Sequence, residues 1–507
     1  MATKQEHRSC KILVTVGMFL FLMVLYPETT FAQGSWYWNQ SLNTEASLLS
    51  GAVVAGESGI AAIYYNPATI PQMTKSNLSL SANLFSLTIF NAKNALGSDF
   101  PANRAQFNVQ PRILTLTLNP RKKPDLTIEL AYFCKVNDYY QINQGSWLTG
   151  DIITSNPGNE NYSAEYYLRL KFLDYYGGIG LGYKLTNSLA IGFSGMISYK
   201  DDQYYNLITT QAFTGPENVP VPPEQYLSEG MYHLKYNMYD VRLITKMGVH
   251  WRNQSWSLGA NLNFPSLKLF GDGTVVKQYQ YSDIHKEAAN PETYNTYYGG
   301  RQKHCISHFK DPFSVAVGTN YYTPSGNTIL LFTAEYFFGL SAFDYIEASH
   351  EPGENGYDFA PGEPEDWLSF TIRQKPIFNA GVAWRRRISD ELMFSGGFRT
   401  DFNYNDPVGD GGFLEYNQRN FYNFDVYHLN SGLGYGFKRG SIIVGMQFSY
   451  GQANDQYQVV NLTDPVEYIN DSQLPLTGPI FNNVQIRYYD IMVYFGFVFN
   501  FMKNENL

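Results

Sequence analysis

The chain has 507 residues, with 36 Lys and Arg against 45 Asp and Glu, which gives a formal net charge of −9. Proteins that bind nucleic acid present clustered basic residues, so this balance argues against a nucleic-acid partner. Charged residues make up 16% of the chain, below the roughly 25% of an ordinary soluble domain. Aromatic residues also reach 16%, with 41 Tyr and 35 Phe. Because transmembrane β-barrels carry aromatic girdles at both bilayer surfaces, this composition favours a membrane barrel.

The N-terminus is typical of an exported protein. Basic residues such as Lys4 and Arg8 precede an apolar run from Ile12 to Leu25, and a small-x-small motif ends at Ala32. This pattern predicts a signal peptide over residues 1–32. The apolar run is too short to be a spanning helix, and no later stretch reaches the roughly 18 apolar residues that such a helix needs. A membrane-embedded mature chain would therefore have to be a barrel.

The segment 33–76 is predicted to be a compact plug, or hatch, rather than part of a wall. Its centre, Ala52–Ile70, is small and apolar, reading AVVAGESGIAAIYYNPATI. Gly56 and Gly59 permit tight backbone bends, and Pro67 fixes its own φ. A piece of this kind packs inside something else.

From residue 77 to residue 501 the dominant pattern is alternation of apolar and polar residues, as in Leu126, Ile128 and Leu130 against Thr127 and Glu129. This period of two indicates β-strands with one face toward lipid and the other toward a polar lumen. Short turns alternate with long polar loops, and the segments between them predict about fourteen antiparallel strands in a transmembrane barrel. The long loops are expected at about Asn91–Gln106, Asn143–Glu160, Thr210–Glu229, Asp272–Asp311, Ser349–Asp366, Asn405–Tyr416 and Asn461–Ile480.

The last predicted strand resembles the C-terminal recognition signal of outer-membrane barrels. Tyr494, Gly496, Phe499 and Phe501 supply its glycine and alternate aromatic residues. We expect these residues to be read by the barrel assembly machinery. Residues 502–507 form a short tail beyond the barrel.

Asn66-Pro67-Ala68, which ends the small Gly/Ala-rich run, resembles the hatch of the FadL/TodX-like outer-membrane transporters of long-chain fatty acids and other hydrophobic compounds. Trp256–Gly273 is similar to a strand of that family that ends in a Pro/Ser step and a glycine. Phe378–Asp401 and Tyr427–Gln452 look like two of its late hairpins. The resemblance therefore extends through most of the barrel.

The resemblance implies passive transport of a hydrophobic molecule by a monomer in the outer membrane of a Gram-negative bacterium, without a cofactor. A ligand would be caught by outer loops, enter a pocket in the barrel and leave sideways into outer-membrane lipid after the hatch shifts. Gly56, Gly59, Asn66, Pro67 and Ala68 would then be gate residues; a static plug is the alternative. By chain order the kink for sideways release belongs in the third strand, about Leu126–Tyr140, although that strand has neither Pro nor Gly.

Lumen-facing charges, namely Glu129, Lys135, Lys200, Arg242, Glu335, Arg399 and Asp401, are expected to form internal ion-pair networks. Arg242 and Arg399 are also candidate contacts for a ligand carboxylate, because a guanidinium group binds a carboxylate in a bidentate fashion.

The best metal-like cluster is His304, Cys305 and His308. It offers three ligands where a structural zinc site typically has four, so no metal site is predicted. Cys134 and Cys305 are not expected to form a disulfide, because one falls in a strand pattern and the other in a predicted loop.

Two other functions remain open. A structural or adhesive barrel predicts a lumen sealed by the hatch, with no apolar pocket. A lipid-modifying enzyme predicts a Ser/His pair within hydrogen-bonding reach, for which His428 is the strand histidine with nearby serines. For transport, fatty acids are the favoured ligand, and haem, sterols and aromatic hydrocarbons stay possible.

Overall fold

The structure is a computed structural model of the whole chain. It describes residues 35–38, 41–73, 77–153, 158–214, 227–287, 292–349, 356–359, 367–406, 423–438, 440–471 and 473–500. The predicted signal peptide and the C-terminal tail lie outside these residues, as does Phe501. No helix among the described residues is long and apolar enough to cross a membrane.

The described residues form one antiparallel sheet that closes on itself, because β19 pairs with both β18 and β1. Before the sheet come the short helices α2 (Thr44–Leu48) and α3 (Ala62–Tyr65) and the 3-10 turns η1 (Gly59–Ala61) and η2 (Pro67–Gln72). The strands are β1 Asn77–Lys93, β2 Ala102–Leu118, β3 Leu126–Gly150, β4 Glu160–Lys184, β5 Leu189–Thr214, β6 Leu227–Arg252, β7 Trp256–Asn263, β8 Leu267–His285, β9 Thr293–Ser307, β10 Ser314–Tyr322, β11 Thr328–Phe337, β12 Leu340–Glu347, β13 Gly356–Asp358, β14 Phe370–Gln374, β15 Ile377–Arg387, β16 Leu392–Asp401, β17 Asp425–Phe437, β18 Gly440–Tyr457 and β19 Asn482–Asn500.

Four positions in the wall hold two of these strands end to end. β7 and β8 both pair with β6. β10 pairs with β7 and β9 pairs with β8, so β9 and β10 share the next position. β11 and β12 share the position after that, and β15 and β14 share the following one. With β13 as a short addition to β9, the wall has fourteen strands, which confirms the predicted barrel. Pro265, Pro312 and Pro376 lie at three of the breaks and Gly339 at the fourth. Proline has no N–H to donate to a ladder, so it interrupts a strand.

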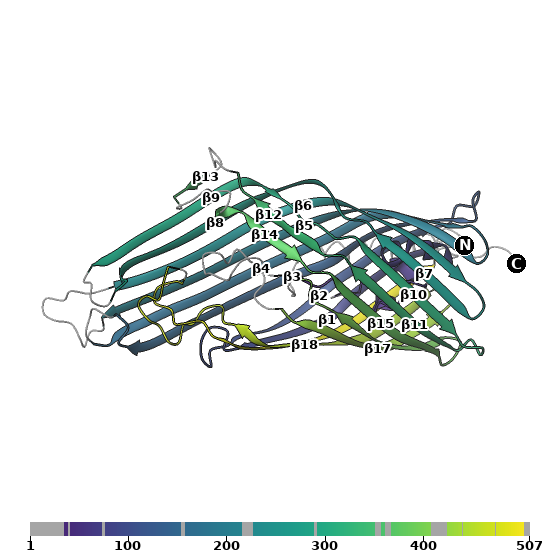
Figure 1. The fold of residues 1–507 in the computed structure, drawn as a ribbon. Helices are drawn as coiled ribbons and strands as arrows, with labels where there is room; N and C mark the ends of the chain where they lie inside the picture. Colours follow the sequence, from purple (N-terminus) through teal and green to yellow (C-terminus); the bar gives the residue numbers. More distant parts are fainter. Residues whose placement is uncertain are drawn as a thin grey trace, which may run out of the picture.

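The predicted loop positions need correction, because several strands run far beyond a bilayer thickness. β3 to β6 have 25 or 26 residues each, and they extend with β8 and β9 toward the end opposite the short turns (Figure 1). Most of the expected loop Asp272–Asp311 is in fact the paired strands β8 and β9. The polar residues there suggested a loop. The long hairpins instead surround a hydrophobic core inside the barrel, so their strands carry apolar residues on the inner face and polar residues on the outer face.

The outer surface of the barrel carries an apolar belt nearer the short turns. In β5, Ile191, Phe193 and Ile197 point outward and are about four-tenths exposed, while Ser194 and Ser198 between them are buried. The outward rings of Tyr199 and Tyr239 stack 6.3 Å apart, as those of Tyr132 and Tyr175 do at 6.1 Å. This alternation, with aromatic rings at one margin, is the pattern of a lipid-facing wall.

The inside of the barrel is filled. Residues 41–73 occupy the lumen on the side of the short turns, as the purple segment in Figure 1 shows. The opposite half holds a large apolar core formed by strand residues and inserted loops, including Trp36, Phe90, Tyr140, Leu168, Tyr236, Phe309, Phe370, Leu462 and Leu476.

Wall glycines bring the hatch directly against the strands, and the atoms met are hatch backbone at Gly192, Gly259, Gly318 and Gly381 and hatch side chains at the other positions. At each of them an added methyl group would lie closer than 3 Å to a hatch atom, a separation that real side chains essentially never show. These glycines run around much of the barrel: Gly180 and Gly182 in β4, Gly192 in β5, Gly248 in β6, Gly259 in β7, Gly318 in β10, Gly381 in β15, Gly397 in β16, Gly432 in β17, Gly445 in β18 and Gly496 in β19. We call this set the glycine belt.

Gly192→Ala is predicted to loosen the hatch while the barrel stays folded, because the added methyl group would overlap the backbone at Pro67–Ala68. Overpacking costs about 1–3 kcal/mol, so the displaced fraction should rise roughly five- to 150-fold. Cleavage after Glu57 by a glutamate-specific protease, followed by mass spectrometry, measures it. Gly195→Ala is the control on the same strand, since its methyl group would meet only Phe193, at 4.0 Å. Equal cleavage of the two variants would contradict the proposed contact.

Candidate functional site

Asn66 ties the end of the hatch to itself and to the wall. Its side-chain oxygen accepts from the N–H of Ala68 at 3.0 Å, which caps η2, and its amide donates to the carbonyls of Val54 (2.8 Å) and Val249 (3.2 Å). Pro67 follows as the first residue of η2, where its missing N–H costs nothing. Asn66 and Ala68 are fully buried. Asn-Pro-Ala therefore fixes the hatch to β6 in this state.

Gly56 and Gly59 form the sharp bend that precedes this cap. Their φ angles of +116° and +54° lie in the region that favours glycine. A methyl group at Gly59 would also overlap the carboxylate of Glu45. Between them Glu57 accepts from Arg385 of β15 at 2.7 Å, so the bend is held by the wall as well as by its glycines.

A cavity lies between the hatch and the wall. It is small, because the space open to the centre of a water-sized sphere is about 80 Å³, below the roughly 300–1,000 Å³ of small-molecule sites, so a large ligand would fit only after the hatch shifts. The hatch side includes Tyr37, Trp38, Leu42, Val54, Tyr64 and Tyr65, and the wall side includes Lys135, Tyr176, Lys246, Asp311, Glu335 and Arg399. The lining is therefore aromatic and charged rather than purely apolar as transport was expected to require, because inward positions of a barrel strand are polar.

Two ammonium groups flank one hatch ring in this cavity. Lys246 Nζ lies 3.5 Å from the centroid of Tyr64, and Lys135 Nζ lies 5.9 Å from it. Burial raises the pKa of Tyr64 to about 12, so its phenol stays neutral. Within the part of the chain that the structure describes, neither lysine makes a hydrogen bond or an ion pair. Lys246 was not singled out from the sequence, although it shares the inward parity of Arg242 on β6.

The carboxylates of the cavity are already occupied. Glu335 accepts from Trp38 Nε1 at 2.8 Å, from Asn263 Nδ2 at 2.7 Å and from Ser314 Oγ at 2.6 Å. Asp311 pairs with Arg242. The two lysines therefore leave the cavity with positive charge available to a ligand.

Arg242 is buried in a cluster of three carboxylates. It pairs with Asp174 at 3.1 Å, with Asp240 at 3.3 Å and closely with Asp311. The sequence predicted such networks for the lumen charges, and Arg242 has one, whereas in the described ranges Lys135 makes no ion pair and Glu335 accepts from neutral donors. A ligand carboxylate at Arg242 would have to displace one of these partners, which makes Lys135 and Lys246 better placed for that role.

Arg399 lines the cavity, and its guanidinium is joined to the hatch. Its Nε donates to the carbonyl of Trp38 at 3.1 Å, and its Nη1 donates to Ser41 Oγ at 3.3 Å. A ligand could still reach it from the cavity.

The third strand is irregular within the predicted range. The β2–β3 ladder runs from Leu118↔Ile128 to Ile113↔Phe133 and then stops, and a register shift between β3 and β4 makes Lys135 a bulge residue. Beyond that point β2 pairs with β1, and β3 pairs with β4. We call the unpaired boundary the β2–β3 seam. Arg104 of β2 bridges it by donating to the carbonyl of Gln141 at 2.9 Å.

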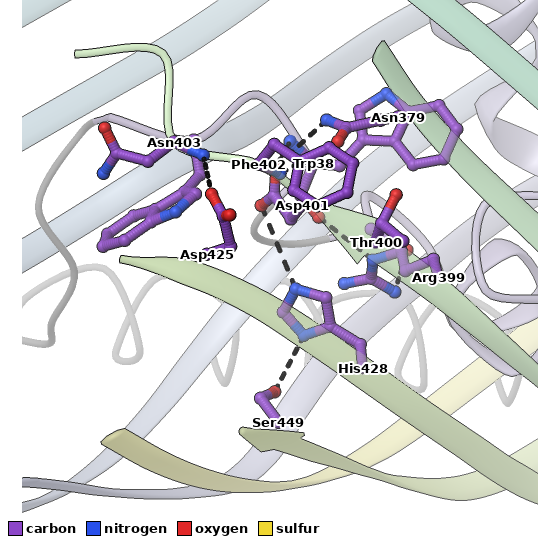
Figure 2. Close-up of polar contacts among 12 residues, drawn as sticks. Trp38, Asn379, Arg399, Thr400, Asp401, Phe402, Asn403, Asp425, His428 and Ser449 are labelled. Carbon is purple, nitrogen blue, oxygen red and sulfur yellow. Dashed lines mark hydrogen bonds and ion pairs between the residues drawn. The ribbon is translucent and has the colours of Figure 1, made fainter. Parts of the chain in front are cut away.

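A Ser/His pair does lie within reach in the lumen wall. His428 Nδ1 and Ser449 Oγ are 2.8 Å apart, and His428 Nε2 is 3.9 Å from Asp401 (Figure 2). These three side chains are at most 1% exposed, and they do not line the cavity. Asp401 instead accepts from the N–H of Trp38 at 3.0 Å. The distance expected for an enzyme is therefore met, but in a cluster that the N-terminal segment covers.

The His304, Cys305 and His308 side chains do not converge. His304 pairs with Asp272 and His308 with Glu347, each at 3.1 Å. Cys305 and Cys134 are both buried free thiols in this structure. In the described ranges, no group of three or more His, Cys, Asp or Glu side chains is placed to hold a metal ion.

Three of the four residues expected to signal barrel assembly, Tyr494, Gly496 and Phe499, lie in the closing strand β19. Tyr494 is buried in the lumen and its hydroxyl donates to Gln447 at 2.7 Å, while Gly496 belongs to the glycine belt. Phe499 lies opposite Leu78 of β1. Recognition by the assembly machinery stays a prediction.

No protein-family model matches the sequence, and no curated protein matches it either. Among solved structures, a FadL homologue of Pseudomonas aeruginosa is 10% identical over 92% of this chain and 100% of that chain, with a TM-score of 0.50. The toluene transporter TodX of P. putida is 12% identical over 91% and 99%, with a TM-score of 0.50. A TodX mutant described as a monoaromatic hydrocarbon channel is 14% identical over 88% and 95%, with a TM-score of 0.51.

The fold and the site define a transmembrane β-barrel of fourteen strands with an N-terminal hatch in its lumen. Its architecture is that of the FadL and TodX type of outer-membrane transporter. The family resemblance seen in the sequence is thus supported by the fold.

Ser449→Ala tests the enzymatic alternative. The change should leave ligand uptake unaltered and destabilise the barrel by about 1–3 kcal/mol, because His428 loses a buried hydrogen-bond partner. Uptake of labelled oleate and hydrolysis of a chromogenic fatty ester are measured in parallel, with Ser431→Ala as the control. Ester hydrolysis by the wild type that disappears only in Ser449→Ala would establish the enzyme instead.

Proposed function

We propose that the protein is a passive route for hydrophobic molecules, above all long-chain fatty acids, across the outer membrane of a Gram-negative bacterium. The observation that carries this proposal is a cavity bounded by both the hatch and the wall, in which two lysines contact aromatic rings but make no hydrogen bond or ion pair with the described residues. The barrel would act as a monomer and without a cofactor. Aromatic hydrocarbons are the second ligand class, because the related folds include a toluene transporter.

The lining suits a ligand with a charged head and an apolar body. A carboxylate would lie between Lys135 and Lys246 and would form charge-assisted hydrogen bonds with both ammonium groups. The apolar body would pack against rings such as Tyr65, Tyr176 and Phe337. Burying apolar surface contributes about 25 cal/mol per Å², so these rings supply much of the binding free energy.

Transport also needs the hatch to shift and the wall to open. The hatch is held by Asn66 and by the bend at Gly56 and Gly59, so release of these contacts would connect the cavity with the lumen on the side of the short turns. Sideways release would use the β2–β3 seam. Lys135, which lines the cavity, is the bulge residue at that seam.

A static plug in a structural barrel is the second candidate. The glycine belt favours it, because close contact around most of the wall resists sliding. The two candidates differ in whether loosening the hatch changes uptake.

Lys246→Met should weaken oleate binding roughly tenfold or more, because a charge-assisted hydrogen bond contributes about 1.5–3 kcal/mol. Toluene binding should change little, since it has no charge to lose. Quenching of tryptophan fluorescence reports both, because Trp38 lines the cavity. Lys123→Met, at an exposed turn, is the control. Unchanged oleate binding in Lys246→Met would exclude the head-group role.

Asn66→Ala should raise uptake several-fold if the hatch is a gate, because the variant loses three hydrogen bonds that hold the closed position. Asn253→Ala is a matched control, since the Asn253 side chain also hydrogen-bonds to the backbone, accepting from two N–H groups, but lies in a short turn away from the hatch. Cells expressing equal amounts of each barrel are compared for labelled oleate uptake. Identical rates would support the static plug.

A further inference from the structure

The wall has a second unpaired boundary, five strands away from the β2–β3 seam. The ladder between β8 and β9 ends at Gly273↔Cys305, and the ladder between β7 and β10 begins again at Asn263↔Ser314. Between these rungs the described residues show only two hydrogen bonds across the boundary. They run from the N–H of Ser266 to the carbonyl of Asp311 at 3.3 Å and from the N–H of Asp311 to Ser266 Oγ at 2.8 Å.

The chain on one side of this boundary leaves the wall and enters the lumen. We call Ser307–Phe313, which joins β9 to β10, the strap. Ser307 Oγ donates to the carbonyl of Tyr239, two strands away, at 2.8 Å. The same oxygen lies so close to Gly271 that a methyl group at position 271 would overlap it. Phe309 is buried against Phe172, with ring centroids 6.3 Å apart.

The strap is also part of the cavity wall. Asp311 and Pro312 line the cavity, and Asp311 is drawn inward by its ion pair with Arg242. A ligand held near Lys246 is therefore separated from this boundary by two residues of the strap.

The outer face of the boundary is apolar and open. Leu267, Leu269 and Phe270 at the unpaired start of β8 are 59%, 50% and 58% exposed. Tyr239, on the neighbouring strand, stacks with Tyr199 in the aromatic margin of the apolar belt. Apolar side chains at a gap in a lipid-facing wall suit the passage of an apolar molecule into lipid.

We propose that this boundary is a second sideways route between the cavity and membrane lipid, with the strap as its movable element and the Asp311–Arg242 ion pair as its latch. The inference rests on the proposed function of the cavity as a ligand site. When the strap swings out of the lumen, Ser266 and Asp311 separate, and the cavity opens between the strap and the start of β8, Leu267–Phe270. The apolar body of the ligand leaves first along these side chains.

A reversible lock tests the route. Ser266→Cys and Asp311→Cys are combined in a chain whose Cys134 and Cys305 are replaced by Ala. The two hydrogen bonds between positions 266 and 311 place their backbones as close as a disulfide requires. Asp311→Cys alone is the control, because it also lacks the latch but has no partner thiol.

Oxidation of the double variant should lower oleate uptake below that of the Asp311→Cys control by the share that uses the strap route, because the β2–β3 seam remains available in both proteins, and dithiothreitol should restore it. Mass spectrometry verifies the disulfide, and comparing one protein in two redox states excludes a folding defect. Unchanged uptake by the fully oxidised protein would overturn the strap route. Fluorescence titration of the wild type with oleate separates the two proposals: binding without an effect of the lock rejects only the strap, and absence of binding rejects the transport function itself.

Discussion

Close contact between the hatch backbone and the barrel wall is the constraint on which the other features depend. A folded segment inside a barrel must satisfy its own polar groups, and the glycine belt lets it do so by approaching the strands directly. The carbonyl of Ala55 accepts from Ser257 at 2.6 Å and from Asn320 at 3.2 Å, and the N–H of Ile63 donates to Glu129 at 3.1 Å. The cavity is the space left where the belt ends and larger side chains hold the hatch away from the wall.

The chemistry of that cavity follows from the alternation of the strands. Outward positions must be apolar for lipid, so inward positions carry the charges, and each buried charge needs a partner. Arg242 has three carboxylates and Glu335 three donors, whereas among the described residues Lys246 contacts the face of Tyr64 and makes no hydrogen bond or ion pair. The face of an aromatic ring stabilises an ammonium group less than a carboxylate does, so an anionic ligand would stabilise the Lys246 ammonium further. A polar cavity can therefore serve an amphipathic ligand.

The sequence predicted the elements whose cause is local. Alternation and turn residues gave the number of strands, and Asn66 and Pro67 marked a cap that the structure contains. The predicted strands were too short. Polar residues on the outer face suggested loops, and the sequence does not show that distant segments cover the inner face of the same strands. The role of Gly192 as a contact for Pro67 has no local sign, since it depends on residues far away in the chain. The distance between Ser449 and His428 could not be predicted for the same reason, because the two residues lie on different strands. The structure shows that both are buried.

The two unpaired boundaries both begin beside a proline, but they are bridged in different ways. At the β2–β3 seam, Pro111 of β2 lies two residues from the last rung, Ile113↔Phe133, and has no N–H to donate to β3. Arg104 bridges the gap by donating to the carbonyl of Gln141. At the strap, Pro312 removes a ladder donor, and the strand then fills its own gap by turning inward. The strap is held by the Asp311–Arg242 ion pair, by two hydrogen bonds across the gap, by the hydrogen bond from Ser307 to Tyr239 and by the burial of Phe309. The two proposed routes would therefore differ in what must be released: at the strap all of these contacts, and at the seam the bridge that Arg104 makes.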